Sequence, residues 1–169
     1  MRSRSVKRGV LVTLMLLCVS GCARAPLGPP FERAPLPPES RARLYLFRVD
    51  ERPSLATVRV TVDGREIGSF RNGEYETLEL SAGSHHVRAG MRSIALVAWG
   101  WNEQRIRFAP GETLFVHLSV RLTEREQPAA AGLEIAGRQS GSASENVYIQ
   151  IQPEREALSM IEGTTRLVP

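Results

Sequence analysis

Cysteine is the residue of this chain whose chemistry is easiest to place. Cys22 directly follows Val19, Ser20 and Gly21, at the end of an apolar run over residues 9–17. A thiolate is a soft nucleophile and can form a thioether. The small residues before the cysteine allow the chain to enter a narrow protease site. We therefore expect Cys22 to be modified, with cleavage of the chain directly before it.

A leader with the layout of a secretory signal precedes this cysteine. Four basic residues open it, and the apolar run is too short to span a bilayer comfortably. Val-Ser-Gly-Cys resembles the bacterial lipobox, in which the cysteine receives a diacylglycerol, the chain is cut before it, and the new amine is acylated. The alternatives are an ordinary secretory signal with a chance cysteine, or an uncleaved anchor. Cys18 directly follows residues 9–17, within the expected signal peptide, and has no expected role.

Lipidation at Cys22 would hold the chain at a membrane. Three acyl chains, each contributing about 0.8 kcal/mol per buried methylene, make an effectively permanent anchor. In the lipoproteins that this pattern resembles, Asp after the cysteine favours the inner membrane. Ala23 at that position therefore implies the outer membrane of a Gram-negative cell, with the protein facing the periplasm.

Histidines, serines and carboxylates give weaker signals. His85 and His86 are neighbours on an expected strand, so they point to opposite faces and cannot easily share a metal ion. His117 lies on the polar face of another strand. We expect no metal site and no cofactor, and interpret His85 as a structural histidine on an apolar face.

The usual catalytic motifs are also missing from the sequence. Gly137-x-x-Ser140-Gly141 is not the Gly-x-Ser-x-Gly elbow of hydrolases. There is neither a phosphate loop nor a dinucleotide fingerprint. We expect no catalytic residues, and a hydrolase with an unrecognised site is the least favoured function.

Both tryptophans lie together in Trp99-Gly100-Trp101, at the end of an apolar stretch without clean alternation. One interpretation is a buried strand or a loop that covers the core. The other is an aromatic patch that docks a partner, a glycan or a membrane, since tryptophan is favoured at such surfaces. Polar residues follow at 102–104, so we expect Trp99 to pack inward and Trp101 to be more exposed. That split requires a departure from a regular strand at Gly100.

The charge of the chain does not indicate a nucleic-acid partner. The formal net charge is +4, from 22 basic and 18 acidic residues, but four of the basic residues lie in residues 1–21. The remaining 148 residues carry 18 of each sign, so no basic patch is left to indicate such a partner. Cys22 would be the only cysteine left, so no disulfide is expected even in an oxidising compartment.

Three parts are expected along the chain: a signal peptide over 1–21, a lipidated tether over 22–40 and a folded domain over 41–169. Six of the eleven prolines fall between residues 26 and 38. Proline restricts φ and removes donors, so a polyproline-like spacer could hold the domain up to roughly 50 Å from the lipid surface. Simple disorder is the alternative interpretation of the tether.

The folded part has the period-two pattern of strands. Residues 44–47 are apolar on both faces and predict a central strand, and residues 114–122 form the longest clean alternation. Asp63-Gly64 is typical of a two-residue type I′ hairpin turn. A short helix is expected between Pro153 and Gly163, at a sheet edge or an open end. The prediction is an all-β fold, an antiparallel β-sandwich or partly open barrel of about seven to nine strands, with one short C-terminal helix.

Several of these turn and strand signals resemble a PEGA-type repeat. The matching stretches are Val60-Thr61-Val62-Asp63-Gly64, Gly68, Leu78-x-Leu80-x-Ala82-Gly83-x-His85-x-Val87 and Phe108-x-Pro110-Gly111. Residues 42–161 also resemble uncharacterised bacterial lipoproteins with one such β-sandwich. The resemblance implies a fold, and no catalytic residues carry over. We expect a lipid-anchored protein that binds or scaffolds another cell-envelope component. A carbohydrate- or peptidoglycan-binding module is the alternative.

Overall fold

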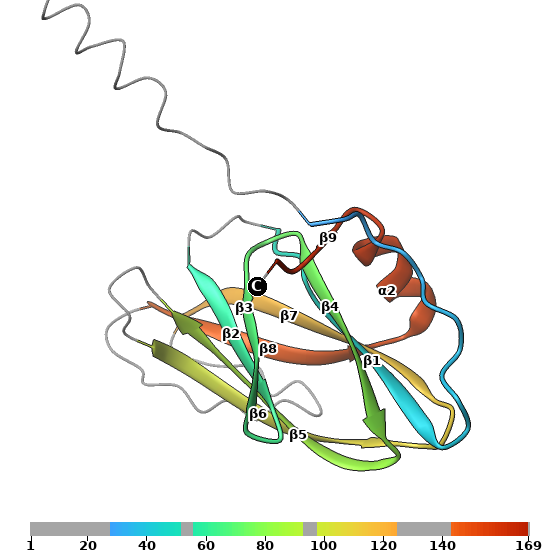
Figure 1. Cartoon of the computed structure of the whole chain (residues 1–169). Coiled ribbons are helices and arrows are strands. Elements are labelled where there is room, and N and C mark those ends of the chain that lie inside the picture. Colours follow the sequence, from blue (N-terminus) through green and yellow to red (C-terminus); the bar gives the residue numbers. More distant parts are fainter. Residues whose placement is uncertain (1–27, 52–55, 93–97, 125–142, 169) are drawn as a thin grey trace, which may run out of the picture.

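Two β-sheets and one helix form from residues 28–51, 56–92, 98–124 and 143–168, the part that the computed structural model describes (Figure 1). In chain order the elements are β1 (Arg41–Arg48), β2 (Thr57–Val62), β3 (Arg65–Phe70), β4 (Glu74–Ser81), β5 (Gly83–Arg92), β6 (Ala98–Phe108), β7 (Thr113–Glu124), β8 (Ala143–Gln152), α2 (Glu154–Ile161) and β9 (Thr165–Arg166). The predicted all-β sandwich with one C-terminal helix is confirmed, and the described strands close no barrel.

The two sheets differ in size and in strand direction. The five-stranded sheet has the order β8-β7-β1-β4-β9, and the four-stranded sheet has the order β3-β2-β5-β6. Most neighbours are antiparallel, but β1 pairs in parallel with β7, and β4 pairs in parallel with β9. The first strand, β1, therefore lies in the middle of its sheet, between β7 and β4, and neither of these follows it directly in the chain.

β1 is buried on both faces, as its sequence predicts. Ala42, Leu44 and Leu46 belong to the core between the two sheets. Tyr45 and Phe47 point the other way, into a second apolar cluster. Because side chains alternate along a strand, a strand with no polar face needs cover on both sides.

Helix α2 provides that cover. Its buried residues Ala157 and Ile161 join the second cluster with Tyr45, Phe47, Tyr75 and Phe115. The helix therefore lies on the outer face of the five-stranded sheet, whereas the sequence predicted a sheet edge or an open end. None of the described helices is long and apolar enough to cross a membrane.

The Asp63-Gly64 turn has the backbone that its sequence predicts. Both residues have positive φ, 51° at Asp63 and 78° at Gly64, as a type I′ turn requires. The turn joins β2 to β3 in the four-stranded sheet.

The described part of the expected tether lies against the domain. Residues 28–34, which we call the strap, are bonded to β9 and to tyrosines of the five-stranded sheet. Extended, proline-rich chain can bond in this way because its carbonyls and remaining N–H groups are free. A free spacer over residues 23–40 is therefore wrong for residues 28–34, and residues 23–27 lie outside the described part.

Candidate functional site

Trp101 lies at an irregularity in the pairing of β5 with β6. Ala89 pairs with Asn102, but Met91 pairs with Trp99, so Gly90 alone faces both Gly100 and Trp101. This bulge adds one residue to β6 and reverses the alternation of faces. The predicted departure from a regular strand at Gly100 is present.

The ring of Trp101 lies close to two residues of β5. A Cβ added to Gly90 would overlap three atoms of the indole ring, so the ring lies directly over the backbone there. The Arg88 guanidinium carbon lies 4.4 Å from the centroid of the same ring, a cation–π arrangement. Trp101 is partly exposed and Arg88 is exposed. A glycine at position 90 is what permits this close approach.

Trp99 occupies a different position from Trp101. It pairs with Met91, which is fully buried in the core between the sheets. Its own side chain lies outside the described part of the structure. The sequence grouped the two tryptophans, whereas the register separates their positions by the bulge.

Two further arginines extend the surface beside Trp101. Arg105 and Arg107 alternate along β6 with the buried Ile106 and Phe108, so they point to the outer face of the four-stranded sheet. Both are exposed, and neither has a carboxylate partner among the residues described. We call Trp101, Arg88, Arg105 and Arg107 the tryptophan face. The arginines were missed because an alternating Arg-x-Arg pattern usually marks only a solvated strand face.

A depression of about 510 Å³ lies next to Arg107, between the turns that follow β4 and β6. Its walls come from Ala82, Gly83, Phe108, Ala109 and Pro110, with Arg107 and Glu112 as the charged members. One cation and one carboxylate do not make a catalytic pair without a third group to tune them. We regard the depression as the end of the tryptophan face.

His85 and His86 point to opposite faces, as predicted. His85 is buried, with Nδ1 2.6 Å from the Asp63 carboxylate and Nε2 2.9 Å from the Ser81 carbonyl oxygen. Burial works to lower the pKa of His85, but these two bonds outweigh it and raise the pKa above its ordinary value. The backbone N–H of His86 and the His85 ring together lower the pKa of Asp63. His85 is thus the hydrogen-bonded structural histidine expected from sequence.

His117 is buried rather than exposed on a polar face. Its Nε2 donates to the Val49 carbonyl oxygen at 2.8 Å, and its ring stacks on Phe47 at 5.1 Å. Burial lowers the pKa of His117. Its Nδ1 and the Oγ of Ser119, two residues on, are buried without a partner among the described residues. The two are not bonded to each other, so no serine–histidine nucleophile is assembled there.

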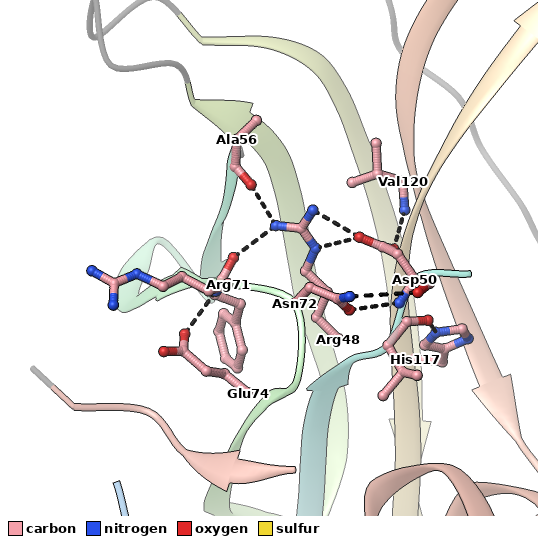
Figure 2. Close-up of polar contacts among 10 residues, drawn as sticks. Arg48, Asp50, Ala56, Arg71, Asn72, Glu74, His117 and Val120 are labelled. Carbon is pink, nitrogen blue, oxygen red and sulfur yellow. Dashed lines mark hydrogen bonds and ion pairs between the residues drawn. The ribbon is translucent and has the colours of Figure 1, made fainter. Parts of the chain in front are cut away.

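A buried ion pair, which the sequence did not predict, stands at the end of β1 (Figure 2). Nε and Nη2 of Arg48 lie 2.8 and 2.7 Å from one Asp50 oxygen, and both side chains are almost fully buried. Arg48 also donates to the carbonyl oxygens of Ala56 and Phe70, and the second Asp50 oxygen accepts from the Val120 N–H. These bonds join β1, β3 and β7, so the pair is a structural tie.

Asn72 completes that network from the turn before β4 (Figure 2). Its Oδ1 accepts from the Asp50 N–H at 2.7 Å, and its Nδ2 lies 3.4 Å from the Asp50 carbonyl oxygen. The N–H of Gly73 donates to the Arg48 carbonyl oxygen. The sequence contained one indication of this burial. Side chains alternate along β1, so Arg48 lies on the same inward-facing side as Leu44 and Leu46. No group of three metal-ligating side chains gathers in the described residues.

The lipobox residues Val19, Ser20, Gly21 and Cys22 lie outside the described residues. The chain matches no protein-family model, and a comparison with curated proteins finds no match.

Proposed function

We propose that this chain is a lipoprotein, anchored through Cys22 in the outer membrane, whose periplasmic β-sandwich binds or scaffolds another component of the cell envelope. The leader, the lipobox-like residues and the resemblance to single-domain lipoproteins support the anchor. The tryptophan face supports the binding role. The anchored domain would present this face to its partner, and no chemical step is assigned to it.

The position of Trp101 carries the proposal. Binding hot spots are enriched in tryptophan and arginine, and they cluster where side chains are held in place before the partner arrives. Trp101 and Arg88 stack on each other over Gly90, so they lose little rotamer freedom on binding. A partly exposed tryptophan in a fixed orientation is a suitable anchor for a partner surface.

The arginines indicate an acidic partner surface. Elsewhere on the four-stranded sheet, Arg59 is paired with Glu66 at 2.6 Å, and Glu103 lies 3.4 Å from His86. Arg88, Arg105 and Arg107 lack such carboxylate partners in the described part of the chain. An acidic surface would complement them, speed association and suppress other partners. Glu103 also lies on this face, opposite Arg88, so the three arginines leave a local excess of positive charge on a chain whose net charge after residue 21 is near zero.

The geometry favours a protein partner over a neutral glycan. A sugar ring stacks on an open face of an aromatic ring, but the Gly90 backbone and the Arg88 guanidinium both lie close to the Trp101 ring. These contacts reduce the ring surface that a sugar could cover. The edge of the indole and the guanidinium groups remain available for contact with carboxylates and apolar side chains.

Affinity capture from detergent-solubilised envelope tests the proposal, using the full lipidated chain. We expect Trp101→Ala to lose its specific partner while its melting temperature falls only modestly, because a partly exposed ring costs less to remove than the roughly 3–5 kcal/mol of a buried aromatic residue. Leu36→Ala is the matched control, since Leu36 is 77% exposed and lies away from the tryptophan face. Equal capture of the partner by wild type, Trp101→Ala and Leu36→Ala contradicts the proposal.

A second arm separates the two kinds of partner. Purified peptidoglycan sacculi are incubated with the same three chains, and the bound fraction is measured by sedimentation. Loss of sacculus binding in Trp101→Ala alone would favour the glycan module. We expect no difference between the variants there, and a difference only in protein capture.

A further inference from the structure

The strap is bonded to the domain along most of its length. The Pro29 carbonyl oxygen accepts from the Arg166 N–H at 2.7 Å, and the Phe31 N–H donates to the Thr164 carbonyl oxygen at 3.0 Å. Further on, the Ala34 N–H donates to the hydroxyl oxygen of Tyr45 at 2.9 Å. Backbone groups of both partners are satisfied, so the strap belongs to the folded domain.

Aromatic packing fixes the middle of the strap. The Phe31 ring meets Tyr75 edge-on, with centroids 5.2 Å apart, and meets Tyr45 in the same way at 5.8 Å. Arg33 forms an ion pair with Glu154 at the start of α2. Edge-to-face aromatic pairs stabilise the fold beyond the burial of the rings alone. The strap is therefore held by side chains as well as by its backbone.

The first described residue of the strap is also in close contact. A Cβ added to Gly28 would overlap the Arg166 carbonyl oxygen and would lie 3.3 Å from the Val168 side chain. Only glycine permits this approach. The strap is thus seated against β9 as far back as Gly28.

Gly28 lies at one particular end of the sandwich. β9 pairs with the first residues of β4, Glu74 and Tyr75, so the start of the strap lies beside the turn before β4 (Figure 1). The far end of β4, at Ser81, is about 23 Å away at the usual rise per residue. The turn between β6 and β7, which includes Ala109, lies at that far end, because Phe108 pairs with Gly83.

We infer that the β9 end of the domain is held at the bilayer surface, with Val168 facing the lipid headgroups and the turn at Ala109 directed away. This inference rests on lipidation at Cys22, part of the proposed function. Six Cα-to-Cα steps separate Cys22 from Gly28, and a fully extended chain spans only about 20 Å over them. The headgroup layer takes up about 5–7 Å of this reach.

The chain between Cys22 and the strap is thus much shorter than the spacer of roughly 50 Å that the proline content predicted. A spacer that was free up to residue 40 would let either end of the domain approach the lipid. A strap seated from Gly28 onward leaves the domain little freedom to turn over. Val168, with 45% of its surface exposed, is an apolar residue at the end that this geometry brings to the membrane.

Energy transfer to the membrane tests the orientation. The full lipidated chain is reconstituted in phosphatidylcholine vesicles that carry an acceptor dye on a fraction of the headgroups. A donor is attached to Val168→Cys in one variant and to Ala109→Cys in the other. Cys18 and Cys22 are the only native cysteines, and the mature, lipidated chain has no free thiol of its own. We expect transfer to be severalfold higher from position 168.

A longer tether is the matched control. An insertion of about twelve flexible Gly/Ser residues after Ala23 lengthens the chain between Cys22 and Gly28 without touching the strap. It should reduce the difference between positions 168 and 109. Equal transfer from both positions in the parental chain would overturn the inference.

Flotation of the same samples separates the two possible failures. A chain that does not float with the vesicles contradicts the lipid anchor, and the orientation is refuted with it. A chain that floats but transfers equally from both positions contradicts the orientation alone.

Discussion

The Asp63 carboxylate stabilises the four-stranded sheet from within a hairpin turn. One oxygen accepts from the His86 N–H at 2.8 Å, and the other lies 2.6 Å from Nδ1 of His85. The turn conformation supplies this geometry, since Asp tolerates positive φ better than most residues. A residue that the sequence assigned only to a turn thus also orients a buried histidine.

The pair should give the domain a pH-dependent stability that Asp63→Asn removes. The folded pKa of His85 is raised above 6.5, so its contribution is present below pH 6.5 and is lost as the pH rises through the folded value. The folded pKa of Asp63 is lowered below 3.8, so its contribution is present above pH 3.8 and is lost as the pH falls through the folded value. The two windows overlap between pH 3.8 and 6.5.

Melting temperatures of wild type and Asp63→Asn, measured from about pH 3 to about pH 9, check this. Asparagine suits the turn equally well, so only the charge is changed. We expect the difference to be largest between pH 3.8 and 6.5 and to reach a few degrees at most, because half of the Asp63 side chain is exposed. A difference that grows above pH 7 would contradict a charged pair.

At the scale of elements, the Arg48–Asp50 pair ties together strands that do not neighbour one another in sequence. Arg48 bonds to the Phe70 carbonyl oxygen of β3, and Asp50 bonds to the Val120 N–H of β7. One strand belongs to each sheet. The pair therefore holds the two sheets in register at this end of the sandwich.

Asp50→Ala should lower the free energy of unfolding by about 3–5 kcal/mol, because it leaves the Arg48 guanidinium buried without a counter-charge. Arg48→Met combined with Asp50→Ala should recover part of that loss, since both charges are then absent. Urea unfolding measures both. Glu66→Ala, which breaks the exposed pair with Arg59, should cost less than about 1 kcal/mol. Equal losses in Asp50→Ala and Glu66→Ala would show that burial of the pair contributes nothing.

The sequence could predict those elements whose conformation depends on residues close to one another in the chain. The Asp63-Gly64 turn depends on two φ angles, and the strands depend on local alternation, so both were predictable. The parallel pairing of β1 with β7 joins residues about seventy positions apart, and no local pattern encodes it. Arg48 was missed for a related reason: Asp50 is close in sequence, but both side chains are buried only by strands that come later in the chain.

The candidate site shows the same division. Polar residues after Trp101 indicated that the strand must be irregular at Gly100, and the bulge is there. The Trp101 ring stacks over Gly90 of the neighbouring strand β5. Its contacts therefore could not be predicted from the sequence around Trp101. The strap was mistaken for free spacer because proline content reports local stiffness, whereas docking depends on Tyr45, Tyr75 and β9.

At the scale of the whole molecule, the strap that leads toward the proposed anchor and the tryptophan face are separate. The strap runs along β9 and the outer side of the five-stranded sheet, while the tryptophan face belongs to the four-stranded sheet. An anchored domain could therefore bind a partner without releasing its strap. This separation is consistent with a scaffold that holds a partner near the membrane.

Replacing Cys22 tests the anchor directly. Cys22→Ala removes the thiol that would form the thioether, so the chain should accumulate as a precursor without incorporated fatty acid. Cys18→Ala is the matched control and should incorporate the label normally, because that residue lies within the expected signal peptide, before the cleavage point. The measurement is incorporation of radiolabelled palmitate in growing cells. Equal labelling of Cys22→Ala and wild type would contradict the lipoprotein assignment.

The contact between the strap and β9 also bears on when the protein can fold. A chain made from its N-terminus brings out Phe31 early, yet the Thr164 carbonyl oxygen that Phe31 bonds to comes 133 residues later. β1, at the centre of the five-stranded sheet, likewise waits for β7. Closing such long loops is slow, and folding rates fall as contacts become more distant in sequence. The domain is therefore completed only after its last residues have emerged, and a chain cut short before Thr164 cannot seat its own N-terminal segment.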